Sequence, residues 1–283
     1  MRTFLVTGSK GFVGKYLVKE LEKDRCSIIK FDKASGKDIT KWKDLQSVPK
    51  ADVVFHLAAR TYVPWCIENP RETYEINTFG TLNILEYCRK CNAKLVYTSS
   101  YVYGIPEYLP IDENHPLKPN NTYSKSKLMA EQLCINYHTD YNLKCTILRP
   151  FNIYGPGQSN DFLMPTIVRQ IKENNKIKLK DSSPKRDFIY VADMVNALTK
   201  AADYNKFGIF NIGYGKSYSV EQVVKRLVNI HGKKVRVTYT NERRKNEVAD
   251  CYADISKAKK ELNWKPRVSI DDGLKNVYRL YKK

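Results

Sequence analysis

A tyrosine and a lysine stand four residues apart in the segment YSKSK, as Tyr123 and Lys127. On an α-helix this spacing places the two side chains on one face. The pKa of a free tyrosine is about 10, and a nearby ammonium lowers it by favouring the phenolate. A phenol tuned in this way is a general base that removes a proton from an alcohol. An isolated Tyr–Lys pair is more often a surface feature. Assigning a catalytic role to this pair therefore depends on which other residues accompany it.

Two serines, Ser99 and Ser100, follow directly on the β-prone segment 94–98, KLVYT. Open α/β sheets bind ligands at the carboxyl ends of their strands. A serine hydroxyl at that edge is placed to hydrogen-bond the reacting oxygen of a substrate. The serines and Tyr123 therefore point to one reaction centre.

Three glycines, Gly8, Gly11 and Gly14, lie between the β-prone run 2–7 and an amphipathic pattern over about 12–22. The first permits a tight turn, the second lets the backbone approach a pyrophosphate, and the third lets a helix pack on a strand. The helix N-terminus would then offer free N–H groups to the phosphates. This spacing, between a strand and a helix, indicates a dinucleotide site.

An acidic residue, Asp32, ends the second β-prone run, 27–32. A carboxylate at this place accepts hydrogen bonds from the ribose hydroxyls of adenosine and repels the extra phosphate of NADP. NAD is therefore the favoured cofactor, although the neighbouring Lys33 weakens the discrimination.

Short apolar segments alternate with amphipathic ones over the first 150 residues. Strands are expected at 2–7, 27–32, 52–56, 94–98 and 144–148, and helices at 12–22, 71–91 and 123–137. This alternation is typical of an α/β fold with a parallel sheet covered on both faces. Beyond Pro150 the alternation loosens, and helices are expected near 162–174, 191–203, 219–231 and 270–282. Two domains are therefore expected, over 1–150 and 151–283, partly interleaved near 186–212.

The composition is that of a globular protein: 283 residues, 42% hydrophobic and 28% charged. It excludes a disordered chain, a coiled coil and a collagen-like repeat. No apolar run approaches the ~18 residues of a membrane span, and the N-terminus lacks a signal-peptide pattern. A cytoplasmic location is expected, with no membrane partner.

The net charge is +19, from 49 Lys and Arg against 30 Asp and Glu. Such a charge suits either a nucleic acid or a lysine-rich surface on an enzyme with phosphorylated ligands. A lysine-rich surface on an enzyme is the favoured interpretation, because the basic runs are short. Seven cysteines are scattered along the chain, and no second CxxC pair or His pair accompanies Cys88 and Cys91. No metal site is therefore expected.

Taken together, these motifs resemble the extended short-chain dehydrogenase/reductase family, in its NAD-dependent epimerase/dehydratase group, and most closely the UDP-hexose 4-epimerases. The resemblance covers nearly the whole chain. Its segments are TGSKGFVG at 7–14, HLAA at 56–59, SSYVYG at 99–104, YSKSK at 123–127, RPFNIYGPGQ at 149–158, RDFIYVAD at 186–193, NIGYG at 211–215 and ADISKAKKELNWKP at 253–266.

The resemblance implies a Rossmann-type, doubly wound domain that holds NAD and a smaller C-terminal α/β lobe that holds a nucleotide-diphosphate sugar. The implied catalytic residues are Ser99, Tyr123 and Lys127. The implied cofactor contacts are Gly8, Gly11, Phe12, Val13, Gly14, Asp32, Asp38, Ile39, Leu57, Ala58, Ala59, Tyr123, Lys127 and Pro150. The implied substrate contacts are Ser99, Tyr123, Asn152, Leu163, Arg186, Arg244, Glu247 and Cys251. The family carries a glycine between the arginine that matches Arg244 and the acid that matches Glu247. In this sequence the position of that glycine holds Asn246.

The residues at two positions restrict which reactions of the family are expected. Dehydratases of this family carry one or two acids directly after the catalytic serine or threonine, and decarboxylases tend to carry a glutamate there. Here the positions hold Ser100 and Tyr101, which argues against both reactions. The resemblance then favours a 4-epimerase: Tyr123 removes the 4-hydroxyl proton, hydride passes from C4 to NAD, and the keto sugar turns before hydride returns. The alternatives are an NAD(P)H-dependent nucleotide 4-keto-sugar reductase or a dehydratase, and a non-catalytic RNA-binding Rossmann protein.

Two further expectations follow from the resemblance. In UDP-hexose 4-epimerases a position four after the Glu247-type acid limits the room near the sugar 2-substituent. Cys251 stands there, and its small side chain predicts that N-acetylated UDP-sugars fit. Family members are commonly homodimers through a four-helix interface that includes the helix carrying Tyr123.

Overall fold

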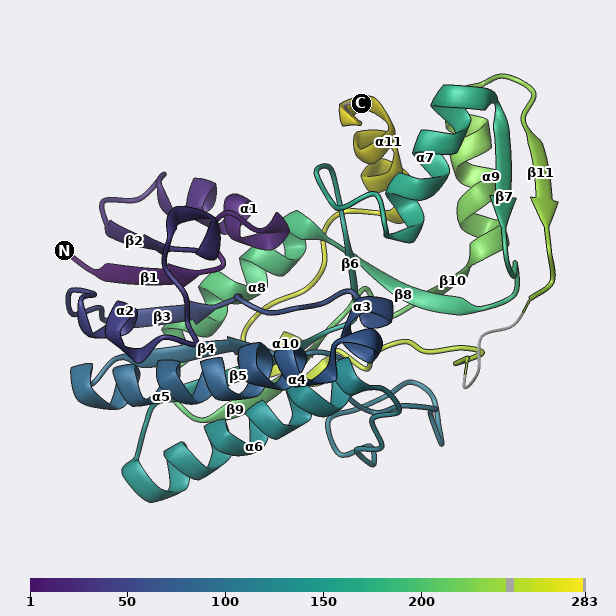
Figure 1. Cartoon of the computed structure of the whole chain (residues 1–283). Helices are drawn as coiled ribbons and strands as arrows, with labels where there is room; N and C mark the ends of the chain where they lie inside the picture. Colours follow the sequence, from purple (N-terminus) through teal and green to yellow (C-terminus); the bar gives the residue numbers. More distant parts are fainter. Residues whose placement is uncertain (243–246, 282–283) are drawn as a thin grey trace.

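Six parallel strands form the central sheet of the computed structural model, in the spatial order β2-β1-β3-β4-β5-β9 (Figure 1). They are β1 (Thr3–Thr7), β2 (Ser27–Phe31), β3 (Val53–His56), β4 (Lys94–Thr98), β5 (Cys145–Pro150) and β9 (Gly208–Ile212). The structure describes residues 1–242 and 247–281. The strands are short and mostly apolar because helices cover both faces of the sheet. The expected α/β fold with a doubly wound parallel sheet is confirmed.

Alternate residues of β1 enter two different cores, since successive side chains on a strand point to opposite faces. Phe4 and Val6 join the cluster formed with α1 (Phe12–Leu21) and α8 (Val191–Asp203). Leu5 joins the opposite cluster, formed with α2 (Trp42–Gln46), α5 (Gly80–Cys91) and α6 (Thr122–Tyr141). The chain passes from β1 out to β2 and back to β3 on the other side of β1. The carboxyl ends of β1 and β3 therefore border the crevice where such sheets bind ligands.

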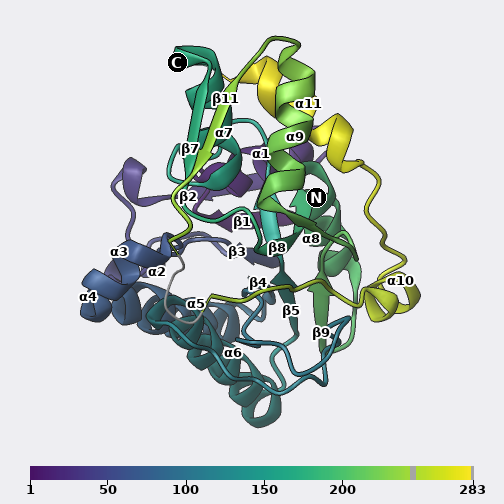
Figure 2. The same ribbon diagram turned by 90° about the vertical axis from the view of Figure 1, so that its right-hand side faces the viewer.

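A smaller lobe stands at the carboxyl end of the sheet (Figure 2). It contains a sheet of β10 (Ser217–Ser219), β8 (Lys185–Tyr190) and β6 (Asn152–Tyr154), and a pair of β11 (Arg236–Tyr239) and β7 (Lys176–Leu179). Helices α7 (Leu163–Asn174), α9 (Val220–His231) and α11 (Ile270–Leu280) supply its core. Between these elements the chain returns to the central sheet as α8 and β9, and α10 (Ser256–Glu261) packs beside β9. The two lobes therefore share chain segments.

The single helix expected over 71–91 is divided in the structure. Helix α3 (Val63–Glu68) and helix α4 (Pro70–Tyr74) lead into a π-helical turn, η2 (Glu75–Phe79), before α5 begins at Gly80. Within that turn the Asn77 amide accepts a hydrogen bond from the Arg60 N–H (2.8 Å) and donates to the Ser126 hydroxyl (3.0 Å). These tertiary contacts supply a reason for the widened turn that periodicity does not show.

A buried ion pair joins α6 to β5. The Arg149 guanidinium lies 2.7 Å from the Glu131 carboxylate, and both side chains are almost free of solvent contact. Arg149 also donates to the Tyr103 hydroxyl (3.0 Å), which donates to the Asn211 side chain in β9 (2.6 Å). The pair therefore ties one helix to two neighbouring strands and to the loop after β4.

No helix in residues 1–242 and 247–281 is long and apolar enough to cross a membrane. The same described residues contain no group of three or more His, Cys, Asp or Glu side chains able to hold a metal ion.

We expect Glu131→Gln to lower the free energy of unfolding by about 3 kcal/mol, because it leaves the Arg149 charge buried without a counter-charge. Urea denaturation measures this change. Glu86→Gln is the control: Glu86 pairs with Arg89 near the surface (2.7 Å), and its loss should cost less than about 1 kcal/mol. Equal effects of the two substitutions would contradict the role assigned to the buried pair.

Candidate active site

The close packing of the loop after β1 depends on glycines, which have no side chain. Gly8 has φ +68°, and a Cβ there would lie 2.8 Å from the Ala58 backbone nitrogen. A Cβ on Gly14 would lie 2.0 Å from the Gly8 carbonyl oxygen. Neither contact is possible for a real side chain, so glycine is required at both positions for the loop to meet β3 and α1 this closely.

The N-terminus of α1 faces this loop without a side-chain cap. Gly11 is the N-cap residue, and Phe12 and Val13 begin the helix. The Ser9 hydroxyl beside it is buried and has no hydrogen-bond partner. Uncapped N–H groups and an unpaired hydroxyl at a helix N-terminus suit the pyrophosphate of a dinucleotide. The residues present therefore fit the expected cofactor.

Asp32 lies at the end of β2, next to the glycine loop. Its carboxylate accepts hydrogen bonds from the backbone N–H groups of Lys10 (2.8 Å) and Ala34 (2.9 Å). These bonds fix the carboxylate at the edge of the crevice. The placement agrees with a contact to the adenosine end of the cofactor.

Asp38 and Ile39 lie in the loop that follows. Burial acts to raise the pKa of Asp38, but hydrogen bonds from Thr40 and the charge of Lys33 outweigh it, so the pKa is lowered. Ile39 packs against Gly80, where a Cβ would lie 2.6 Å from the Ile39 side chain. A cleft of about 700 Å³ opens beside Asp38, between this loop and the segment 68–76.

The end of β3 lies between these two regions. The backbone N–H groups of Leu57 and Ala58 donate to the Thr7 hydroxyl (3.2 and 3.3 Å). Ala59 follows them in the loop after β3. Pro150 is the last residue of β5 and is buried beside Ile212 of β9. All of these expected cofactor contacts lie at the carboxyl edge of the central sheet.

Tyr123 and Lys127 lie one turn apart on α6. The Lys127 ammonium is buried and lies 4.4 Å from the centre of the Tyr97 ring. Burial lowers the pKa of Lys127 to about 7, against the charges of Cys134 and Glu131. The ammonium is therefore close to losing its proton at neutral pH.

The pKa of Tyr123 differs from the sequence-based expectation. Burial raises it to about 12, and only a hydrogen bond with Ser100 acts to lower it. Burial, and not the charge of Lys127, governs the pKa of Tyr123, contrary to the effect expected from spacing alone. The phenol therefore keeps its proton at neutral pH.

The two serines after β4 have different roles. The Ser99 hydroxyl is buried and has no hydrogen-bond partner, whereas Ser100 bonds to the phenol of Tyr123. The unpaired buried hydroxyl of Ser99, next in the chain to Ser100, is available to a substrate oxygen. The sequence pointed to Ser99 as the catalytic serine through the family resemblance. The contact of Ser100 with Tyr123 became visible only in the tertiary structure.

The first turn of α6 is fixed from two sides. Asn121 caps it with a reciprocal pair of bonds to Ser124. The Ser126 hydroxyl donates to the Tyr123 carbonyl (2.7 Å) and accepts from Asn77 in the π-helical turn (3.0 Å). Asn77 therefore positions the backbone of the candidate base.

The expected substrate residues gather across the crevice, on the second lobe. Arg186 of β8 donates to the Val248 carbonyl (2.6 Å) and pairs with the Glu247 carboxylate. Cys251 is fully buried. Asn152 of β6 donates to the Asp187 carbonyl (3.1 Å). Leu163 begins α7, at the rim of this lobe. The expected contact Arg244 lies outside the described residues.

Asp187 is a site residue that the motifs did not single out. Its buried carboxylate accepts backbone hydrogen bonds from Tyr214 (2.6 Å), Gly215 (2.9 Å) and Ala253 (3.1 Å). Burial raises its pKa to about 6, although these bonds act to lower it. The carboxylate therefore joins two separate backbone segments, at 214–215 and at Ala253, next to Arg186.

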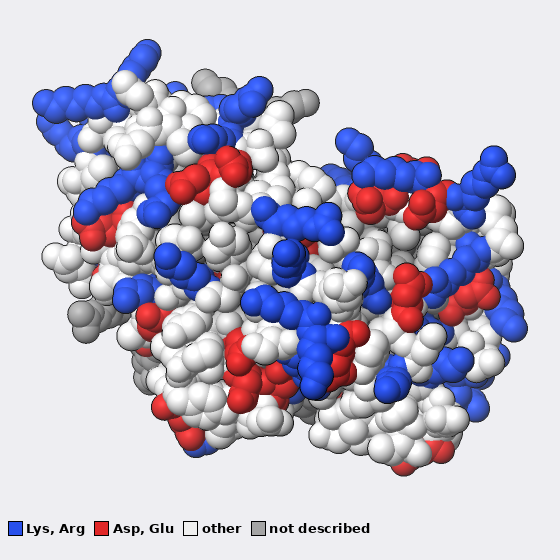
Figure 3. Space-filling view, turned by 180° about the vertical axis from the view of Figure 1, so that it is seen from behind, with Lys and Arg blue, Asp and Glu red and all other residues white. Residues whose placement is uncertain are grey.

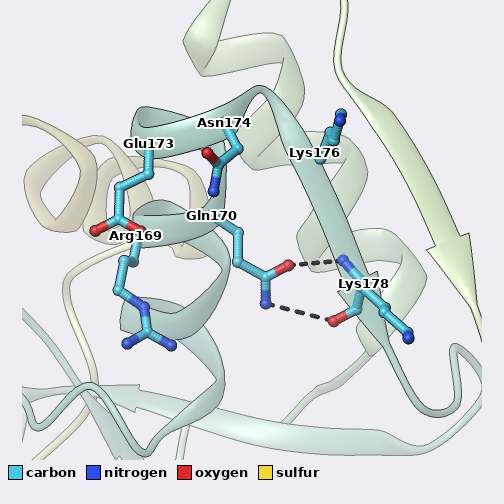
Figure 4. Close-up of a pocket in the computed structure, with 6 residues that line it drawn as sticks. All are labelled: Arg169, Gln170, Glu173, Asn174, Lys176 and Lys178. Atoms are coloured by element: carbon cyan, nitrogen blue, oxygen red, sulfur yellow. Dashed lines mark hydrogen bonds between the residues drawn. The ribbon is translucent and has the colours of Figure 1, made fainter.

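A second hollow, of about 630 Å³, lies apart from these residues, between α7 and β7 (Figure 4). It is lined by Arg169, Gln170, Glu173, Asn174, Lys176 and Lys178. The Gln170 amide bonds to the backbone of Lys178 on both sides and covers the edge of β7. None of the expected catalytic or binding residues line this hollow.

A family model, the NAD dependent epimerase/dehydratase family, matches residues 4–213. The chain belongs to that family. It is 31% identical to the UDP-glucose 4-epimerase of Bacillus subtilis over 97% of this chain and 95% of that protein. It is 29% identical to the GDP-6-deoxy-D-mannose reductase of Pseudomonas aeruginosa over 96% and 94%. The fold is similar to the crystal structure of Thermotoga maritima UDP-glucose 4-epimerase with UDP-glucose, with a TM-score of 0.92, 28% identity and 98% coverage of both chains.

These findings confirm the sequence-based identification of the family, of NAD as the cofactor and of the enzyme class, an NAD-dependent nucleotide-sugar epimerase. The relatives differ in substrate and in reaction, so the sugar and the mechanism are argued below.

We expect Gly14→Ala to weaken NAD binding at least about tenfold, because α1 must move away from the Gly8 carbonyl. Isothermal titration calorimetry with NAD measures the loss. Gly232→Ala, at the end of α9, is the control: its φ of +73° is unfavourable to alanine, but its Cβ would meet no atom within 4 Å. Unchanged affinity in Gly14→Ala would refute the close approach.

The ionisation of Lys127 predicts a pH dependence of stability. Its pKa is about 7 when folded, against about 10.4 in an unfolded chain, so the unfolded chain holds more protons between these values. Raising the pH from 7 to 9 should therefore stabilise the cofactor-free protein, and Lys127→Met should show a smaller rise. Lys94, whose pKa burial lowers to about 8, contributes equally to both proteins. Urea denaturation at several pH values compares them; parallel profiles would contradict the assignment.

Proposed function

We propose that this enzyme is a 4-epimerase of UDP-hexoses, interconverting UDP-glucose and UDP-galactose. The observation that carries the proposal is the buried, unpaired hydroxyl of Ser99, the neighbour in the chain of Ser100, which bonds Tyr123; no carboxylic acid stands at the two positions after Ser99. This arrangement binds and deprotonates a sugar hydroxyl but supplies no acid for eliminating water. Relatives of similar length that are named UDP-glucose 4-epimerase support the choice of nucleotide.

Bound NAD supplies the hydride acceptor for oxidation at C4 of the sugar. In this proposal Ser99 hydrogen-bonds the C4 oxygen and aligns it with the phenol of Tyr123. Tyr123 takes the hydroxyl proton as C4 is oxidised and returns it when the keto group is reduced from the other face. Lys127, with a pKa near neutrality, lies one turn away on the same face of α6, and in this proposal it contacts the cofactor.

The second lobe holds the nucleotide end in this proposal. Arg186 presents a planar guanidinium, which suits a diphosphate because it can bond two oxygens at once. Its pairing with Glu247 fixes the position of the guanidinium. Holding the substrate at the diphosphate leaves the keto sugar free to turn between the two hydride transfers.

A nucleotide 4-keto-sugar reductase is the second candidate. It is favoured by the similarity to the GDP-6-deoxy-D-mannose reductase over nearly the whole chain. A reductase consumes its cofactor, whereas an epimerase regenerates NAD in each cycle, so the two are separated by cofactor stoichiometry.

We also propose that the active protein is a homodimer through α5 and α6. Phe79, which directly precedes α5, and Met129 of α6 are large apolar side chains that are 49% and 52% exposed, and a dimer interface formed there would cover them. Elsewhere the surface is mixed: Figure 3 shows lysines and arginines interspersed with acids on the viewed face. That pattern favours a solvated surface over a continuous nucleic-acid site.

We expect wild-type protein with NAD to convert UDP-galactose to UDP-glucose, followed in the anomeric region of the proton NMR spectrum. Tyr123→Phe should lower the rate at least about 100-fold, because the base is lost while the ring remains. Tyr141→Phe, at the exposed end of the same helix, is the matched control and should retain full activity. Intact UDP-galactose in the wild-type sample would refute the proposal, and NADH consumption with a 4-keto sugar would favour the reductase.

A further inference from the structure

Tyr101 lies where the reacting end of the proposed substrate meets its nucleotide end. Burial raises the pKa of its phenol to about 12, and the groups close enough to act on it are Cys251, Arg186, Tyr123 and Glu247. Tyr123 is the proposed base at the sugar, and Arg186 and Glu247 lie on the nucleotide side. The sugar ring connects these two ends, so the Tyr101 ring flanks its path.

The Tyr101 ring rests on a rigid support. It stacks on the Phe151 ring, with centroids 5.5 Å apart and an angle of 22° between the planes. Phe151 is buried, and its backbone N–H donates to the Ile212 carbonyl in β9 (2.9 Å). Such stacking stabilises a pair beyond the area it buries. The ring therefore holds its position at the edge of the central sheet.

Cys251 does not open onto the site as its small size suggested. Its side chain is 0% exposed, and burial raises its pKa to about 11. Its carbonyl accepts the Asp187 N–H (3.0 Å), which fixes the backbone beside Arg186. Tyr101 packs against the apolar cluster that contains Cys251 and Phe151. The room left by a small side chain at position 251 is thus filled by protein.

We propose that Tyr101 sets the size of the sugar that the site admits, by occupying the space beside Cys251 that an N-acetyl group would need. This inference rests on the proposed function and adds a specificity-determining residue to it. A hexose with a hydroxyl group at C2 fits beside the phenol, whereas the larger N-acetyl group overlaps it. A close-packed site yields little to such an overlap. With Tyr101 in this place, the site excludes N-acetylated UDP-sugars, which is the opposite of the expectation drawn from Cys251 alone.

Binding of UDP-glucose and UDP-N-acetylglucosamine to NAD-loaded protein tests the inference. All proteins carry Tyr123→Phe, so that neither sugar is converted during isothermal titration calorimetry. The parent should bind UDP-glucose at least about tenfold more tightly than UDP-N-acetylglucosamine. Adding Tyr101→Ala should bring the two affinities within about twofold. Tyr101→Phe, which keeps the ring, and Tyr239→Ala, on β11, should both retain the preference of the parent.

An unchanged preference in Tyr101→Ala, or equal affinities in the parent, would overturn the inference. Thermal unfolding checks the fold, and Tyr101→Leu replaces Tyr101→Ala if alanine destabilises the stack on Phe151. The wild-type NMR assay separates the two proposals. A Tyr101-dependent preference without epimerisation would refute the proposed reaction alone, whereas epimerisation with no effect of Tyr101 would refute this inference alone. Failure of the parent to bind either sugar would refute both.

Discussion

The ion pair of Arg149 with Glu131 lies almost without solvent contact and joins α6 to the central sheet. Glu131 follows Lys127 by one turn, so the same helix carries the ion pair and the candidate catalytic residues. An unmatched charge in this interior would cost several kcal/mol, which restricts α6 to one position along β5. Tyr103 and Asn211 extend the contact to the loop after β4 and to β9. The geometry of Tyr123 therefore depends on charges that never meet the substrate.

Burial has opposite effects on the pKa values of the two candidate catalytic side chains, Tyr123 and Lys127. It raises the pKa of Tyr123 to about 12 and lowers that of Lys127 to about 7, since desolvation disfavours the charged form of each. The protein alone thus holds a neutral phenol and a weakly held proton on the lysine. Activation of the phenol then depends on ligands, which ties base strength to an occupied site. The buried hydroxyls of Ser9 and Ser99 likewise have no hydrogen-bond partner in the protein.

The lobes contribute different parts of the site because the chain crosses between them. The glycine loop, Asp32 and the catalytic helix belong to the central sheet, while Arg186 and Cys251 come from segments of the second lobe. Asp187 holds those segments together through three backbone bonds. Tyr101 comes from the first lobe and packs against the cluster containing Cys251. The proposed limit on sugar size therefore depends on residues that are 150 positions apart in the chain and share one apolar cluster.

The sequence by itself determined the family, the cofactor and the parallel α/β sheet. These depend on local patterns, such as glycines between a strand and a helix or a tyrosine one turn before a lysine, which physical chemistry restricts to few uses. It did not determine the π-helical turn at Asn77, the hydrogen bond of Ser100 with Tyr123, or the direction of the Tyr123 pKa shift. Each of these arises from side chains distant in the chain and from the amount of solvent they exclude. Spacing placed Lys127 beside Tyr123, but only packing decided that desolvation would outweigh its charge.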